Sequence, residues 1–85
     1  MPNVIVYSKD YCPYCTKAKQ LLKNKGVEFE EIDITNDTDL QIEVVEKSGG
    51  RRTVPQIFIN DQPIGGYDDM AALDEKGELD TLLAA

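Results

Sequence analysis

The most informative part of the chain runs from residue 4 to residue 15 and reads Val4-Ile5-Val6-Tyr7-Ser8-Lys9-Asp10-Tyr11-Cys12-Pro13-Tyr14-Cys15. Its first four residues are β-branched or aromatic, which predicts a buried strand that ends in a polar loop. From residue 13 onward the pattern becomes helical, and its apolar face carries Ala18, Leu21 and Leu22. Proline is tolerated in the first helical turn, and Gly26 suits the position just after a helix. We therefore expect a strand, a loop and a helix that begins at the two cysteines.

The rest of the chain predicts three further strands and more helix. Residues 27–34 alternate apolar and polar side chains, which predicts a half-exposed strand. A second helix is expected to begin at Asn36 or Asp37 and to end at residues 48–50. Its candidate core residues are Leu40, Val44, Ile42 and Val45. Residues 56–59 and 63–65 predict two short strands joined by a three-residue turn. Another helix is expected to start at Asp68 or Asp69, and residues 78–83 predict a last helical turn or two.

This order predicts an α/β fold. A strand–helix–strand unit implies two parallel strands, and the later pair of strands implies an antiparallel hairpin. The simplest arrangement is one mixed four-stranded sheet flanked by helices, in the order β-α-β-α-β-β-α. The length of 85 residues suits a single domain over residues 1–85.

The charge of the chain excludes some classes of partner. Its formal net charge of −7 argues against nucleic-acid binding, which needs clustered lysine and arginine. No apolar run is long enough for a membrane span, and no targeting segment is recognised, so we expect a cytoplasmic protein. Residues 1–27 nevertheless carry five lysines and one aspartate, a net charge of +4. This basic third either attracts a small anion or simply keeps a helix surface soluble.

Cys12 and Cys15 are the only cysteines, and their C-x-x-C spacing at a strand-to-helix junction is typical of a redox pair. Free N–H groups and the helix dipole at a helix N-terminus favour an anion, here the Cys12 thiolate. The thiolate is the attacking species in thiol–disulfide exchange. Lys9 is placed to add positive charge. Cys15 lies one turn further along, where burial raises its pKa and makes it the later-acting thiol.

The cysteines also allow three other interpretations. A zinc site needs four ligands, and two cysteines with no histidine cannot supply them from this chain alone. A structural disulfide would stabilise the fold more by linking distant segments than by closing a four-residue ring. Two inert buried thiols remain possible in principle, although proline and tyrosine at a helix start argue against burial of both. The sequence therefore predicts redox chemistry and no metal.

Three motifs together resemble the dithiol glutaredoxins of the short bacterial type, over essentially the whole chain. They are Tyr7-Ser8-Lys9-x-x-Cys12-Pro13-Tyr14-Cys15, Thr53-Val54-Pro55-Gln56-Ile57-Phe58-Ile59 and Gly65-Gly66-Tyr67-Asp68-Asp69. The resemblance implies a thioredoxin-like fold and a glutathione-disulfide oxidoreductase. Glutathione would be the reductant, and glutathionylated or disulfide-containing proteins would be the substrates. It also implies that Cys12 is the nucleophile and Cys15 the resolving thiol.

The resemblance further implies a glutathione site. Thr53, Val54 and Pro55 would form a turn with a cis peptide before the proline, which leaves the Val54 backbone free to pair with the ligand. From the residues alone, a plain strand-start proline is the favoured interpretation of Pro55. The remaining contacts implied by the family are Lys9, Tyr14, Gly66, Tyr67, Asp68 and Asp69, and less surely Arg51 or Arg52. In this scheme Lys9 and an arginine hold the glycyl carboxylate, and Tyr14 forms a wall beside the sulfur.

The loop from residue 66 to residue 69 would receive the γ-glutamyl end of glutathione. Its helix N-terminus suits the carboxylate, and an acidic side chain suits the ammonium. The same aspartates could simply cap the helix. Rival functions are an electron donor recycled by a thioredoxin reductase, a two-chain holder of an iron–sulfur cluster, and an interaction domain with idle thiols. We expect a monomer.

Overall fold

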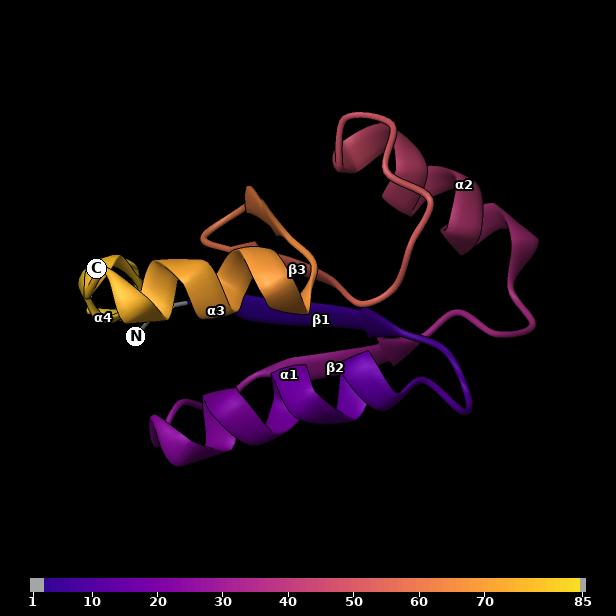
Figure 1. The fold of residues 1–85 in the computed structure, drawn as a ribbon. Helices are drawn as coiled ribbons and strands as arrows, with labels where there is room; N and C mark the ends of the chain where they lie inside the picture. Colours follow the sequence, from indigo (N-terminus) through magenta and orange to yellow (C-terminus); the bar gives the residue numbers. More distant parts are fainter. Residues whose placement is uncertain (1–2, 85) are drawn as a thin grey trace.

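The computed structural model describes residues 3–84 and consists of one four-stranded sheet with helices on both faces (Figure 1). The elements are β1 (Val4–Ser8), α1 (Pro13–Asn24), β2 (Glu30–Asp33), α2 (Thr38–Lys47), β3 (Gln56–Ile59), β4 (Gln62–Gly65), α3 (Tyr67–Glu75) and α4 (Glu78–Leu83). The strand order is β2-β1-β3-β4. The β1–β2 pair is parallel and the other two pairs are antiparallel. The predicted mixed sheet and element order are therefore confirmed.

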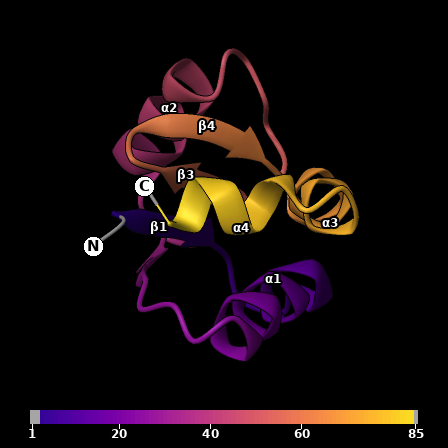
Figure 2. The same ribbon diagram turned by 90° about the vertical axis from the view of Figure 1, so that its left-hand side faces the viewer.

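Two apolar clusters divide the core between the two faces of the sheet. Side chains alternate along β1 and β3, so each strand contributes to both clusters. The larger cluster packs α1, α3 and α4 on one face, and its helical members include Ala18, Leu22, Met70, Leu79 and Leu83. The smaller cluster packs α2 on the other face through Val44, beside the edge-to-face rings of Tyr7 and Phe58. Figure 2 shows α1 and α3 on one side of the sheet and α2 on the other.

The ends of the strands differ from the prediction in two places. The strand expected over residues 27–34 spans only Glu30–Asp33. Its ladder with β1 begins opposite Ile5, and the preceding Val27 and Phe29 pack on the larger cluster instead of pairing. The β3–β4 turn has two residues rather than three, because Asn60 and Asp61 both adopt positive φ angles and reverse the chain at once.

The two outer strands differ from the central pair in composition. β2 carries Glu30, Glu31 and Asp33, whose side chains are all exposed. β4 carries the exposed Pro63, which lies opposite Phe58. The inner strand β3 is buried along its whole length. Among the four strands, charged side chains and proline thus occur only on the two edge strands.

The helices begin and end largely where capping chemistry predicts. Asp37 caps α2 by accepting a hydrogen bond from the Leu40 N–H at 3.0 Å, which decides between the two candidate caps. Val44 is buried as expected, whereas Ile42 is 54% exposed and does not belong to the core. No helix among residues 3–84 is long and apolar enough to cross a membrane.

Candidate active site

Cys12 occupies the N-cap of α1, with extended backbone and Pro13 as the first helical residue. Its Sγ accepts a hydrogen bond from the Cys15 N–H at 3.2 Å. On its other side the thiol donates to the Val54 carbonyl at 3.7 Å, across 42 positions of sequence. The sulfur of the half-buried Cys12 thus lies at the N-terminus of α1, between this helix and the Val54 carbonyl.

Cys15 lies beneath Cys12, with 2% of its surface exposed. Burial and, to a smaller extent, the hydrogen bond with Cys12 raise the pKa of the Cys15 thiol to about 12. The Lys9 backbone N–H and the Lys19 ammonium oppose this shift. Both cysteines are free thiols in this structure. The predicted contrast between an accessible first thiol and a buried second one is confirmed in its geometry.

The loop that faces Cys12 contains a cis peptide bond between Val54 and Pro55, as predicted. Pro55 is buried, and the following Gln56 anchors the loop from below. The Gln56 Nε2 donates to the Thr53 carbonyl at 2.8 Å and to Thr53 Oγ1 at 3.2 Å. Among the described residues, no acceptor is found for the Val54 N–H. The sequence does not indicate that Gln56 holds this loop, because a glutamine inside an apolar strand does not show which residue its side chain contacts.

The N-terminus of α3 forms the second wall of the site. The helix begins at Tyr67, one or two residues earlier than predicted, because Gly66 serves as the N-cap. Asp69 reaches back so that its Oδ2 accepts from the Gly66 N–H at 3.0 Å. The same oxygen accepts from Arg51 Nη2 at 2.7 Å. Asp68 is exposed and makes no side-chain hydrogen bond to the described residues. Asp69 is thus the capping residue, and Asp68 is free to meet a ligand.

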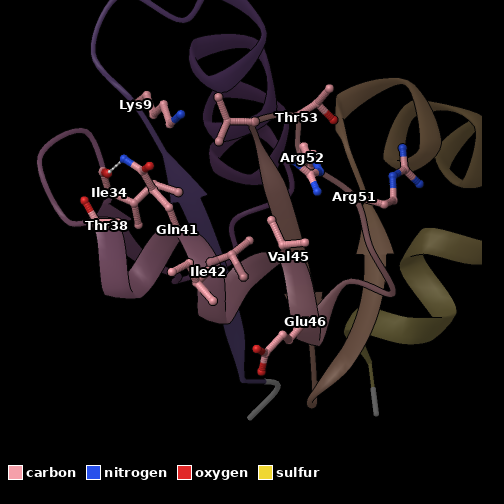
Figure 3. Close-up of a pocket in the computed structure, with 12 residues that line it drawn as sticks. Lys9, Ile34, Thr38, Gln41, Ile42, Val45, Glu46, Arg51, Arg52 and Thr53 are labelled. Carbon is pink, nitrogen blue, oxygen red and sulfur yellow. Dashed lines mark hydrogen bonds between the residues drawn. The ribbon is translucent and has the colours of Figure 1, made fainter.

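These segments border two adjoining cavities. A cavity of about 240 Å³ is lined by Tyr14, Arg51, Thr53, Val54, Pro55, Gly66, Tyr67, Asp68 and Asp69. A second cavity of about 430 Å³ lies between α2 and the loop before Pro55 (Figure 3). Arg51, Thr53 and Val54 line both cavities, so the two adjoin as one groove. Cys12 lines neither cavity, but its thiol contacts the Val54 carbonyl at this shared middle segment. The structure therefore brings the predicted glutathione contacts into the first cavity, except Lys9 and Arg52, which line the second.

Both arginines line the second cavity, but their side chains take different directions. Figure 3 shows the Arg52 side chain below Thr53, whereas the Arg51 guanidinium points away from Lys9 and Thr53. The pairing of Arg51 with Asp69 explains its direction. Gln41 also lines this cavity, with its Nε2 bonded to the Ile34 carbonyl at 2.7 Å. Gln41 was not singled out in the sequence, because only the packing of α2 brings it to the groove.

Two tyrosine rings form the rim of the first cavity. The rings of Tyr14 and Tyr67 lie 6.4 Å apart at an interplanar angle of 35°. The Lys17 ammonium lies 5.2 Å from the centre of the Tyr14 ring. Tyr14 is 52% exposed, so its ring packs only partly on the protein. The predicted aromatic wall is therefore built from two rings.

The cap of α3 makes a pH-dependent contribution to stability. The Gly66 N–H, and then Arg51, hold the pKa of Asp69 below its usual value. A depressed folded-state pKa means that the carboxylate stabilises the fold fully above its unfolded pKa of about 3.9 and loses this effect as the pH falls through the folded value. We expect Asp69→Asn to lower the free energy of unfolding at pH 7 by at most about 1 kcal/mol, since the side chain is 43% exposed.

The check is urea unfolding of the wild type and Asp69→Asn at pH 7 and at stepwise lower pH. The difference between them should shrink below about pH 4. Asp68→Asn is the matched control and should change little at either pH. A difference for Asp69→Asn that stays constant down to pH 2 would contradict the charge-based account.

No group of three or more histidine, cysteine, aspartate or glutamate side chains within residues 3–84 is arranged to hold a metal ion. The site offers two thiols and the polar groups that surround them. The Cys12 sulfur lies beside a groove whose two ends carry opposite kinds of charge, with Lys9 and Arg52 at one end and Asp68 at the other.

Comparison with known proteins agrees with this geometry. The family model described as glutaredoxin matches residues 4–64. Glutaredoxin 3 of Escherichia coli (strain K12) is 53% identical over 83 residues, covering 98% of this chain and 99% of the relative. The crystal structure of a buckwheat glutaredoxin–glutathione complex superimposes with a TM-score of 0.89 at 31% identity, covering 98% of this chain and 77% of that one. The solution structure of a Brucella melitensis glutaredoxin gives a TM-score of 0.84 at 51% identity, covering 95% and 87%. The fold is thioredoxin-like, the relatives support thiol–disulfide oxidoreductase activity, and the chain belongs to the glutaredoxin family.

Proposed function

We propose that the protein is a glutathione-dependent thiol–disulfide oxidoreductase. The observation that carries the proposal is the contact between the Cys12 thiol and the Val54 carbonyl, at the midpoint of the groove. A ligand lying along this groove presents its own sulfur to Cys12. One solved relative is a complex with glutathione. Glutathione has a central cysteine and a charged group at each end, which is the pattern that the groove offers.

The charges of the groove support one orientation of glutathione. Lys9 and Arg52 in the larger cavity suit the glycyl carboxylate, because an arginine can bind a carboxylate through two donors. The unpaired N–H of Val54 suits the backbone of the central cysteine, in the manner of an added strand. The N-terminus of α3 suits the γ-glutamyl carboxylate, and Asp68 suits its ammonium. Arg51 and Asp69 neutralise each other, so we propose that they form part of the wall of the site but do not bind the charged ends of glutathione.

In the proposed reaction with a glutathionylated thiol, the Cys12 thiolate attacks the glutathione sulfur. The bond to the substrate sulfur breaks, and the substrate leaves as a thiolate that takes up a proton. Glutathione remains joined to Cys12. A second glutathione thiolate then attacks that sulfur, which releases glutathione disulfide and regenerates Cys12. This route needs only one cysteine of the protein.

A protein disulfide takes the second route. Cys12 attacks one sulfur of the target, and a mixed disulfide forms while the other target sulfur is released. Cys15 then loses its proton and attacks Cys12, which frees the second target sulfur and closes the Cys12–Cys15 disulfide. Two glutathione molecules reduce this disulfide afterwards. We propose that the chain acts in this way as a monomer in the cytoplasm, a compartment in which thiols stay reduced.

Replacing Cys15 with serine should separate the two routes. We expect Cys15→Ser to retain more than about half of the activity toward a small glutathione mixed disulfide and to lose at least about 90% of the activity toward a protein disulfide. The measurement is NADPH consumption coupled through glutathione and glutathione reductase, for the wild type and the variant. Equal losses in both reactions would contradict the assignment of roles.

The same assay tests the proposed function itself. Activity of the wild type toward the mixed disulfide would establish glutathione as the reductant. An inactive but folded wild type would mean that the groove does not serve glutathione. The next measurements would then be recycling by a thioredoxin reductase and the absorbance spectrum of anaerobically purified protein, which reports a bound iron–sulfur cluster.

A further inference from the structure

A polar cavity lies on the side of the two cysteines away from the glutathione groove. Its volume is about 450 Å³, and it is lined by Ser8, Lys9, Asp10, Tyr11, Cys12, Pro13, Cys15, Thr16, Lys19, Glu31 and Asp33. Of the residues assigned to glutathione, only Lys9 reaches it. This cavity gives the buried Cys15 a polar surrounding that is separate from the groove.

A fixed ammonium group borders this cavity. Lys19 lies one helical turn beyond Cys15 on α1, and its Nζ pairs with Glu31 Oε2 at 2.9 Å. The same carboxylate oxygen accepts a hydrogen bond from the buried Ser8 hydroxyl at 2.8 Å. The Lys19 side chain is only 28% exposed. These contacts hold the Lys19 charge beside the sheet, so it does not swing freely in solvent.

The other charged residues that line the cavity are Lys9, Asp10 and Asp33. Asp33 accepts from the Thr35 hydroxyl at 2.6 Å and from the Thr35 N–H at 2.8 Å. Thr35 in turn accepts from the Asp10 N–H. Lys9 acts on Cys15 through its backbone N–H. Among the described side chains that line the cavity with Cys15, Lys19 is the cation held in place by an ion pair, and Glu31 is the anion that holds it.

We propose that Lys19, held by Glu31 and Ser8, is a positioning residue that stabilises the Cys15 thiolate in the step that closes the Cys12–Cys15 disulfide. The proposal rests on the proposed function, because it concerns that step alone. Cys15 gives its proton to solvent water, its sulfur attacks Cys12 Sγ, and the bond from Cys12 to its partner breaks with the electron pair on the departing thiolate. A buried thiolate is costly without a nearby positive charge. The direction of the effect agrees with the pKa of Cys15, which Lys19 lowers and burial raises.

The test isolates this step in a single turnover. Reduced protein is treated with one equivalent of oxidised glutathione, and the intramolecular release of glutathione from Cys12 is followed by rapid quenching and mass spectrometry over a range of pH. We expect Lys19→Gln to slow this release about three- to tenfold at pH 7 and to move its pH profile to higher pH. Lys19→Arg should restore most of the rate. Steady-state reduction of a small glutathione mixed disulfide should change less than about twofold.

Lys23→Gln is the matched control. Lys23 lies one turn beyond Lys19 on the same helix and is exposed. Its replacement by glutamine removes the same charge from the protein. It should leave both reactions unchanged. An unaltered release rate in Lys19→Gln would overturn the proposal, and so would equal losses in the two reactions, which would place the effect on Cys12 or on the fold. A wild type without mixed-disulfide activity would instead contradict the proposed function, so the two failures are distinct.

Discussion

Replacing Cys12 with serine should abolish reduction of both glutathione mixed disulfides and protein disulfides, with losses greater than about a thousandfold. A serine hydroxyl stays protonated at neutral pH and cannot form a disulfide, so neither route can begin. The buried Cys15 cannot take over, because its thiol is 2% exposed and its pKa is raised to about 12. The measurement is the coupled NADPH assay used for Cys15→Ser.

The fold of Cys12→Ser should be intact. A serine oxygen at the N-cap of α1 can accept the hydrogen bond that Cys12 Sγ now accepts from the Cys15 N–H. Thermal unfolding should therefore agree with that of the wild type within a few degrees. The contrary result would be a glutathione adduct on the remaining cysteine, detected by mass spectrometry, together with activity above about a tenth of wild type. This result would show that Cys15 is the nucleophile.

Replacing Gly65 with alanine should produce the largest loss of stability of any single change considered. Gly65 is buried at the end of β4 and has a φ angle of +113°, which L residues rarely adopt. An added Cβ would collide with the Asp69 carboxylate and lie 2.8 Å from Arg51 Nη1. We expect the free energy of unfolding to fall by about 2–3 kcal/mol and the Tm by about 10–20 °C.

Gly66→Ala is the matched control, one residue away. Gly66 has a φ angle of −90°, and its added Cβ would lie 3.5 Å from the Pro55 carbonyl, an ordinary contact. Its cost should be below about 1 kcal/mol, mainly from the poorer N-cap. Because the clash at Gly65 displaces the Asp69 cap, Gly65→Ala should also raise the KM for a glutathione mixed disulfide. Equal stability of the two variants would contradict the argument from backbone conformation.

Much of this fold could be predicted from local patterns. The apolar face of α1 and the buried run of β3 are visible in the sequence because each satisfies a simple periodicity. The position of Cys12 also followed from local chemistry, since a proline after it marks the first helical turn. The Cys12 and Cys15 positions needed only the motif and the helix start, and both thiols lie where that reasoning put them.

Other features depended on residues far apart in the chain. The strand β2 starts at Glu30 because its pairing with β1 begins there, opposite Ile5. The alternation of apolar and polar residues in the sequence does not show where this pairing begins. The separate directions of Arg51 and Arg52 follow from the position of Asp69 on α3. Capping rules alone could not decide whether Asp68 or Asp69 caps α3, because both lie in the first turn of the helix. The cis bond before Pro55 was expected only from family resemblance.

The composition of the two outer strands has a consequence for the behaviour of the protein at high concentration. An edge strand with free backbone groups is a template on which other chains can add, and exposed apolar edges therefore lead to aggregation. Glu30, Glu31 and Asp33 place like charges along one border, so two such borders repel each other. Pro63 removes an N–H donor from the opposite border. The same sheet that supports the reactive thiols is in this way protected at both borders against edge-to-edge pairing.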